Sequence, residues 1–268
     1  MARPSTAEPQ SSSQTLHPRM ADGTILVARR HDPTGKPRAV ALLVPDLGED
    51  LTQVDGAAAL LAQRGIRAFA VSLRGHGSSG GRWTLAGHLR DHRAWIATLS
   101  HRERGSVSLP LLIIARGLSA SVALLHEEVT HRHHASHIPP LPDGMLLLDP
   151  IARGASRVPR GLAAALSRRH GACNFLSREQ RGVLRRFTLP PVRVQTPTIL
   201  YASGPLHSED PDDPLRRVFG NARVRRATWL HPTTRVQHLR ADHEIARACV
   251  ELLTADRPHR FRADRRAP

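Results

Sequence analysis

The chain contains the three side-chain types that together cleave esters by nucleophilic attack: a serine beside a tight turn, a histidine and a group of carboxylates. Ser119 stands in the string GLSAS directly after an apolar stretch, Asp210 belongs to the acidic string EDPDD, and His238 follows a later apolar stretch. In such a set the histidine takes the proton of the serine hydroxyl, and the acid orients the imidazole. These residue types therefore permit a triad of Ser119, Asp210 and His238, although Val122 would then stand where the usual nucleophile turn requires a small residue for close helix packing.

Each member of this set also has a structural explanation. Ser119 can serve as a small residue in a tight turn, and His238 can be an ordinary histidine of a loop or of the first turn of a helix. The acidic string can cap the helix that follows it. The catalytic and the structural interpretations both stay open at this stage.

A group of four histidines is a second candidate for chemistry. His131, His133, His134 and His137 have the residue type that binds transition metals, and His133 with His137 has helical i, i+4 spacing. No cysteine or carboxylate accompanies them at ligand spacing, and the string runs into a proline-rich loop. We therefore predict no metal site there, and no motif in the chain indicates a cofactor.

The charge of the chain favours no particular partner. Its 39 Lys and Arg against 23 Asp and Glu give a formal net charge of +16, and Lys36 is the only lysine. An arginine-rich surface can attract nucleic acid, but no RNA-binding signature or helix-turn-helix pattern accompanies it. We favour arginines scattered over a solvated surface and do not predict nucleic-acid binding.

The cysteines and the apolar stretches bear on the location of the protein. Cys173 and Cys249 lie in no spacing typical of a metal site or redox pair. A reducing cytoplasm is the expected compartment. No apolar stretch reaches the roughly 20 residues of a membrane span, and residues 1–19 lack the apolar core of a signal peptide.

Apolar stretches with strand and helix periodicity alternate along the chain, which predicts a doubly wound, mostly parallel α/β sheet. The first two expected strands, 24–30 and 39–44, are separated by a Pro- and Gly-containing turn and are interpreted as a hairpin. The further expected strands are 66–73, 111–115, 145–148, 198–202 and 224–230. The expected helices are 54–64, 85–99, 119–131, 213–218 and 240–253.

No composition break divides the chain into two cores, so one domain is expected over residues 19–255. Residues 1–18 are rich in Ser, Pro and Gln and are expected to be flexible. The alternation stops between about 151 and 195, which we interpret as a small cap inserted over the carboxyl edge of the sheet. Residues 256–268 form a short basic tail that is expected to be flexible.

Four strings occur in the order typical of one enzyme group. They are DGTILVARRHDPTGKPRAVALLV, AAALLAQRGIRAFAVSLRGHGSSGG, LPLLIIARGLSASVALL and GMLLLDP. In this order residues 22–148 resemble the monoacylglycerol lipase and lysophospholipase group of the α/β-hydrolases, also called serine aminopeptidase-like hydrolases. The resemblance implies an α/β-hydrolase fold with a small cap insertion, and the string RGHGSSGG is its most specific part.

The same resemblance locates the catalytic positions, and none of them carries the expected residue. Aligned without gaps, the nucleophile of the G-x-S-x-G elbow falls on Gly117, the acid on Leu206 and the histidine on Val236. The His-Gly of the oxyanion loop is replaced by Pro45 and Asp46. A proline donates no backbone hydrogen bond, and a carboxylate opposes a developing oxyanion.

Two functional hypotheses follow. The first is a pseudoenzyme, which keeps the scaffold of a serine hydrolase and acts by holding a small apolar ligand under the cap or by engaging a protein partner. The second is an active carboxylic ester or acylglycerol hydrolase with the shifted triad of Ser119, Asp210 and His238. A basic protein that contacts nucleic acid is a third hypothesis of lower weight, and the sequence names neither the ligand nor the oligomeric state.

Overall fold

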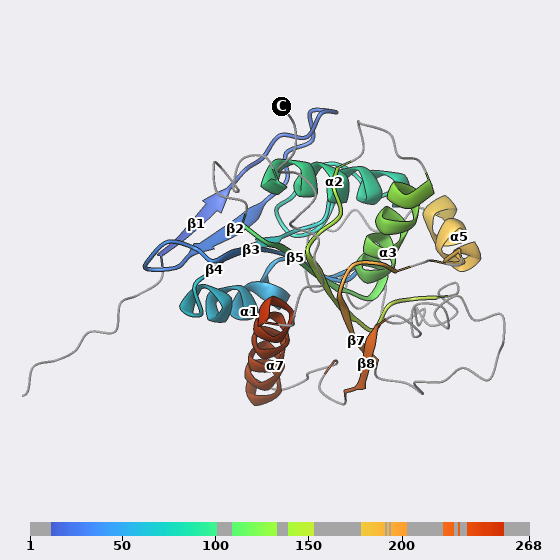
Figure 1. The fold of residues 1–268 in the computed structure, drawn as a ribbon. Helices are drawn as coiled ribbons and strands as arrows, with labels where there is room; N and C mark the ends of the chain where they lie inside the picture. The colour runs from blue at the N-terminus through green and yellow to red at the C-terminus, as the bar shows by residue number, and fades with distance from the viewer. Residues whose placement is uncertain are drawn as a thin grey trace, which may run out of the picture.

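Eight strands form one sheet in the computed structural model, which describes residues 12–100, 109–132, 139–152, 178–190, 192, 194–202, 222–227, 230 and 235–254 (Figure 1). The strand order is β1-β2-β4-β3-β5-β6-β7-β8. The strands are β1 Ser12–Leu16, β2 Ala28–Asp32, β3 Ala39–Val44, β4 Ile66–Val71, β5 Leu111–Arg116, β6 Gly144–Leu148, β7 Thr198–Ala202 and β8 Arg223–Arg226. The strands β4, β3, β5, β6, β7 and β8 are parallel to one another. At the other end of the sheet β2 is antiparallel to both of its neighbours, β1 and β4.

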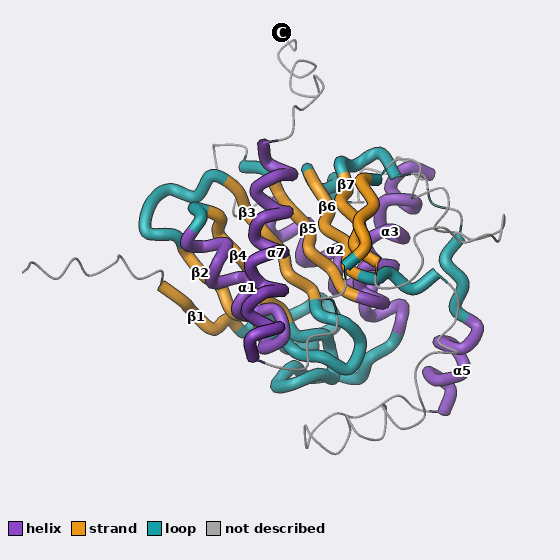
Figure 2. Tube along the Cα trace, turned by 90° about the horizontal axis from the view of Figure 1, so that it is seen from below, coloured by secondary structure: helices purple, strands orange, loops and turns teal. Residues whose placement is uncertain are grey.

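Helices cover both faces of this sheet. The described helices are α1 Thr52–Gln63, α2 Leu85–Thr98, α3 Gly117–Arg132, α5 Arg178–Arg186 and α7 Arg235–Thr254. Helices α1 and α7 pack against each other on one face, and α2 and α3 pack against each other on the opposite face (Figures 1 and 2). The alternation of strands and helices in the sequence thus gives the doubly wound architecture that it predicts.

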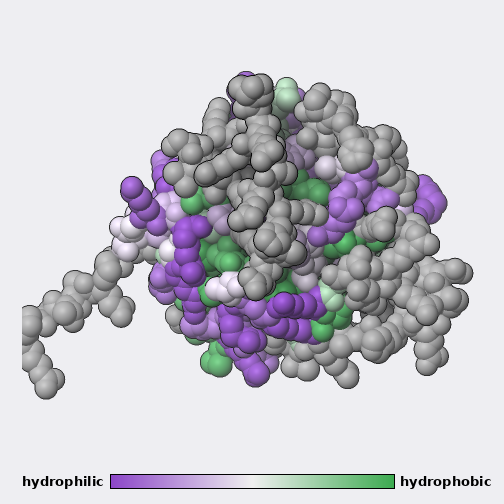
Figure 3. All heavy atoms as spheres, in the orientation of Figure 1, coloured by the Kyte–Doolittle hydropathy of each residue, from purple (hydrophilic) through white to green (hydrophobic). Residues whose placement is uncertain are grey.

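Two apolar clusters hold the layers together, one on each face of the sheet. The cluster under α2 and α3 contains Trp83, Trp95 and Leu118, and the cluster under α1 and α7 contains Leu61 and Ile245. The central strand β3 is buried along its whole length, as expected for a parallel strand covered on both faces. Hydrophilic and hydrophobic side chains both reach the face of the molecule drawn in Figure 3.

The amino-terminal strands differ from the prediction. The expected hairpin of 24–30 with 39–44 is wrong, because β2 pairs with β1 and β4 while β3 takes parallel partners on both sides. Ser12–Leu16 forms β1 although its composition suggested a flexible segment. Its side chains are mostly exposed, so the strand depends on its backbone ladder with β2 rather than on an apolar face.

Other boundaries shift in ways that matter for the site. Helix α3 begins at Gly117, two residues before the expected start, and α7 begins at Arg235, five residues before it. The expected helix at 213–218 and most of the expected cap lie outside the described residues. Of the cap region, α5 is described, and its Leu184 and the following Phe187 belong to the apolar cluster under α2 and α3.

Candidate functional site

A sharp turn joins β5 to α3 at the carboxyl edge of the sheet. Strand β5 ends at Arg116, and Gly117 begins the helix with φ +50°. L-residues with side chains rarely adopt a positive φ, so the turn favours glycine. Gly117 therefore lies at the strand-to-helix turn where the resemblance expects a nucleophilic serine.

The backbone donors beside this turn are occupied by a side chain of the protein itself. In hydrolase elbows the oxyanion hole consists of the N–H of the residue after the nucleophile and an N–H of the loop after the third strand. The corresponding groups are the N–H of Leu118 and of Leu47, and both donate to Oδ1 of Asp46, at 2.8 and 2.7 Å. A Cβ atom built on Gly117 would overlap the same carboxylate. Asp46 thus occupies both the donors and the space that the resemblance assigns to an oxyanion and to a nucleophile side chain.

The surroundings of Asp46 shift its protonation. Burial, followed by the nearby Glu49 carboxylate, raises the pKa of Asp46 to about 6, although the Leu118 and Leu47 N–H groups and Arg116 act in the opposite direction. Glu49 also accepts a hydrogen bond from the Asp46 N–H at 2.9 Å and lies 3.4 Å from the Arg116 guanidinium. At neutral pH Asp46 is therefore mainly an anion held by backbone donors.

The RGHG turn holds the loop that carries Asp46. Nε2 of His76 accepts a hydrogen bond from the Gly48 N–H at 2.9 Å, and Nδ1 of His76 lies 3.0 Å from the carbonyl oxygen of Arg74. Arg74 in turn forms a two-pronged ion pair with Asp91 on α2. The most specific string of the resemblance therefore has a structural task here, which is to position the loop after β3.

Ser119 lies two residues after Gly117, within the first turn of α3 rather than at the apex of the elbow. It is 0% exposed, and its hydroxyl donates to the carbonyl oxygen of Pro45 at 2.5 Å. Its oxygen also lies 3.2 Å from Nε2 of His88. The imidazole beside Ser119 therefore comes from α2, whereas the shifted triad would take it from His238 of α7.

The remaining predicted positions lie elsewhere or outside the described chain. Val236, at the expected histidine position, belongs to the first turn of α7 and is 75% exposed. His238 lines a small cleft with Arg116 and Asp242. Leu206 and Asp210 fall outside the described residues.

That cleft lies at the carboxyl edge of the sheet, where open α/β proteins bind ligands. Its walls combine Leu148 of β6 and Ile245 of α7 with the polar groups of Arg116 and His238. Burial raises the pKa of Asp242, which also lines it, to about 6. Sequence reasoning did not single out Arg116 or Asp242, because neither stands at a catalytic position of the resemblance.

Three findings limit the chemistry of the described residues. No group of three or more His, Cys, Asp and Glu side chains within them is arranged to hold a metal ion. Of the predicted histidine group only His131 is described, and its Nε2 lies 3.5 Å from Oε1 of Glu127. Nowhere in the described part of the chain does a helix have the length and apolarity needed to cross a bilayer.

Comparisons with known proteins support the fold and go no further. No family model matches the chain, and no curated protein matches it in sequence. Solved structures do match. A hydrolase from Pseudomonas aeruginosa has 17% sequence identity and a TM-score of 0.59, over 90% of this chain and 98% of that one.

Two further structures give the same result. An esterase of Pyrococcus furiosus has 13% identity and a TM-score of 0.59 over 91% of this chain and 92% of that one. Vibralactone cyclase has 13% identity and a TM-score of 0.62 over 92% and 81%. The narrower resemblance to monoacylglycerol lipases stays a prediction. The strand order, the elbow turn and these neighbours together show that the chain has the α/β-hydrolase fold.

Proposed function

We propose that this protein is a noncatalytic member of its fold, a pseudoenzyme that acts by binding a ligand or a protein partner. One observation carries the proposal: Oδ1 of Asp46 accepts the hydrogen bonds of Leu47 and Leu118, the two donors that would otherwise stabilise an oxyanion. The absence of a side chain at Gly117 is a second argument for the proposal, because this residue provides no hydroxyl at the turn.

The charge of Asp46 also opposes hydrolysis. Acyl transfer develops a negative charge on the carbonyl oxygen, and donors aimed at that oxygen are commonly worth about 3–4 kcal/mol each. Here the donors already bind an anion. A substrate oxyanion would have to displace that carboxylate or stand beside it, where two like charges repel each other.

The cleft beside the elbow is the place where we propose that a ligand binds. Its free volume is about 10 Å³, so a ligand would have to open it. Leu148 and Ile245 would then contact an apolar group, and Arg116 and His238 would offer hydrogen bonds to a polar end. A protein partner is the alternative occupant of this edge. We propose a cytoplasmic location, since the two cysteines follow no disulfide pattern.

One contact favours a second function, ester hydrolysis through Ser119. The hydroxyl of Ser119 lies beside an imidazole, which is the relation a general base requires. The enclosure of Ser119 argues against it, because a 0% exposed hydroxyl that donates to the Pro45 carbonyl offers no face to a substrate. The acid and the histidine of this hypothesis would be Asp210 and His238.

A fluorophosphonate probe separates the two functions. We expect neither labelling of the full-length chain nor hydrolysis of short p-nitrophenyl esters. Labelling that disappears in Ser119→Ala but persists in Ser121→Ala, a matched buried serine of α3, would overturn the noncatalytic proposal. Ligand binding is tested separately by thermal shift with monoacylglycerols and fatty acids, because a ligand at 100 times its Kd stabilises the folded state by about 2.7 kcal/mol.

A further inference from the structure

Within the described residues the sheet has two open edges, and strand β1 forms one of them. Figures 1 and 2 show β1 as the outermost strand at its end of the sheet, and β2 is its one neighbour among the described strands. The first four residues of β1, Ser12 to Thr15, are all exposed. A strand at an edge presents N–H and C=O groups that can pair with a strand of another molecule.

The ladder between β1 and β2 determines which backbone groups of β1 point outward. The Leu26 N–H donates to the Pro18 carbonyl, in the register that continues the pairing of β1 with β2. Hydrogen-bonded and non-hydrogen-bonded pairs alternate along an antiparallel ladder, so the backbone groups of the even-numbered residues of β1 face β2. Those of Ser13, Thr15 and His17 therefore face away from the sheet.

Strand β1 lacks the features by which proteins protect a sheet edge. Charged side chains, prolines and bulges normally prevent edge strands from pairing with one another. Residues 12–16 contain neither a charged side chain nor a proline, and their register with β2 runs without a bulge. The arginines nearest to them on β2 are paired within the molecule, Arg29 with Asp55 and Arg30 with Asp32.

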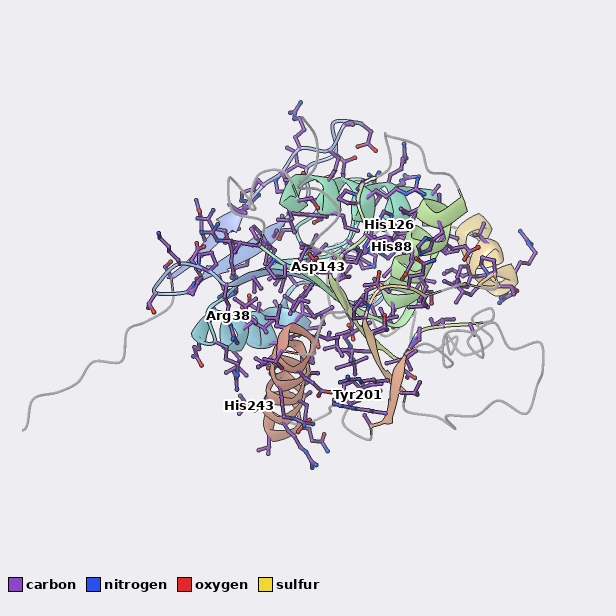
Figure 4. All side chains as sticks on the ribbon, in the orientation of Figure 1. Arg38, His88, His126, Asp143, Tyr201 and His243 are labelled. Atoms are coloured by element: carbon purple, nitrogen blue, oxygen red, sulfur yellow. The ribbon has the colours of Figure 1, made fainter. Side chains whose placement is uncertain are left out.

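The opposite edge of the sheet, formed by β8, is protected by charge. Its sequence is RVRR, and the guanidinium of Arg225 lies over the ring of Tyr201 on β7, 5.8 Å from the ring centroid. Figure 4 shows Tyr201 at this end of the sheet. Two copies of β8 side by side would bring arginines together, and like charges on adjacent strands are destabilising. In a chain with a net charge of +16, β1 is therefore the sheet edge at which two copies can meet.

We propose that β1 is a self-association surface, on which the β1 strand of a second copy of this chain pairs antiparallel. A two-fold axis at Gln14 places Ser13 of one copy opposite Thr15 of the other, so that their outward N–H and C=O groups bond to each other. This pairing uses both β1 edges and leaves only the two β8 edges open. The assembly therefore closes as a dimer and does not grow into a filament.

The contact is small, so we expect a weak dimer. Stable interfaces bury about 800 Å² on each partner, whereas a five-residue strand edge contributes mainly backbone hydrogen bonds. We expect reversible dimerisation with a Kd of roughly 0.1–1 mM. Four strands, β2, β4, β3 and β5, separate β1 from the cleft residue Leu148 on β6, so this proposal does not depend on the proposed function.

Sedimentation velocity of the full chain between roughly 10 µM and 1 mM tests the dimer. The wild type should shift from monomer to dimer over this range. Thr15→Pro removes an outward N–H and keeps the ladder with β2, since edge strands accept proline where its nitrogen faces solvent, and it should stay monomeric. His243→Gln, at an exposed position of α7 (Figure 4), should dimerise like the wild type. A wild type that is monomeric at 1 mM, or a Thr15→Pro variant that still dimerises, would overturn the proposal.

Paired charge variants separate loss of the dimer from unfolding of β1. One protein carries Ser13→Lys with Thr15→Lys, and the other carries Ser13→Glu with Thr15→Glu. Each alone should be monomeric, because like charges meet across the two-fold axis, whereas an equimolar mixture should dimerise. A mixture that stays monomeric would contradict antiparallel pairing of the two β1 strands.

Amide hydrogen exchange followed by NMR reads the same contact residue by residue. The N–H groups of Gln14 and Leu16 bond to β2 and should exchange slowly at every protein concentration. Those of Ser13, Thr15 and His17 should exchange faster in dilute protein and slow by about 2- to 5-fold at 1 mM, in proportion to the fraction of dimer. Exchange at these three positions that is independent of concentration would refute the pairing.

Discussion

Replacement of Gly117 by alanine tests whether the Asp46 carboxylate stands where a nucleophile would. The added Cβ has two costs. A residue with a side chain at φ +50° loses about 1–2 kcal/mol relative to glycine. The Cβ also overlaps the carboxylate, and moving it sacrifices at least one charged hydrogen bond, worth about 1.5–3 kcal/mol. We expect Gly117→Ala to destabilise the protein by about 3–5 kcal/mol in total.

The second cost disappears when the carboxylate is absent, so a double-mutant cycle isolates it. In an Asp46→Ala background Gly117→Ala should cost only the backbone strain, about 1–2 kcal/mol, which leaves a coupling energy of about 2–3 kcal/mol. Circular dichroism during urea and thermal unfolding measures all four proteins. The melting temperature should fall by about 6–20 °C in the wild-type background and by about 2–8 °C in Asp46→Ala. Equal losses in both backgrounds would show that Asp46 does not occupy the space beside Gly117.

Three further changes probe the same molecule. Ser119→Ala should cost about 2–4 kcal/mol in urea unfolding, because it leaves a buried carbonyl and a buried imidazole without their hydroxyl partner; a loss under 1 kcal/mol would contradict those bonds. A change from glycine to alanine inside a helix usually stabilises a protein by about 1 kcal/mol. Gly56→Ala in α1 should instead destabilise it, because the new Cβ would overlap the carboxylate of Asp242. In an Asp242→Ala background the same change should be stabilising. Burial holds the pKa of His126 at about 4, below the value of about 6.5 in the unfolded chain. The unfolded chain therefore takes up the proton first as the pH falls, and the contribution of His126 to the free energy of unfolding, complete above pH 6.5, drops by about 2 kcal/mol at pH 5. Melting curves from pH 7 to pH 5 should therefore lose less stability in His126→Leu than in the wild type, and the exposed control His243→Leu should match the wild type.

The sequence predicts the sheet well because the strands that build it are buried on both faces. The expected strands 39–44 and 198–202 match β3 and β7 residue for residue, since continuous apolar stretches leave little doubt about their ends. Strand β1 could not be predicted in this way. Its residues are polar and mostly exposed, and its partner strand β2 alone makes it regular.

The candidate site could be predicted only in part from the sequence, because several of its contacts join residues that are far apart along the chain. The position of Gly117 follows from local order, because the apolar strand and the small residues after it define the turn. The contact between Asp46 and the Leu118 N–H joins residues 72 positions apart, and that between Ser119 and His88 joins residues 31 apart. No pattern of types or spacing encodes such contacts, which depend on how the layers pack. Helix α7 also starts earlier than its apolar period suggests, which puts Val236 on an exposed helical turn.

The loop after β3 is held by three sets of contacts, and this bears on the proposed absence of hydrolase activity. The RGHG turn binds it through Gly48 and His76, Ser119 binds it at the Pro45 carbonyl, and the backbone of α3 binds it at the Asp46 carboxylate. These contacts hold the Asp46 carboxylate against the Leu47 and Leu118 N–H groups, so a serine placed at the turn would meet a carboxylate and two engaged donors.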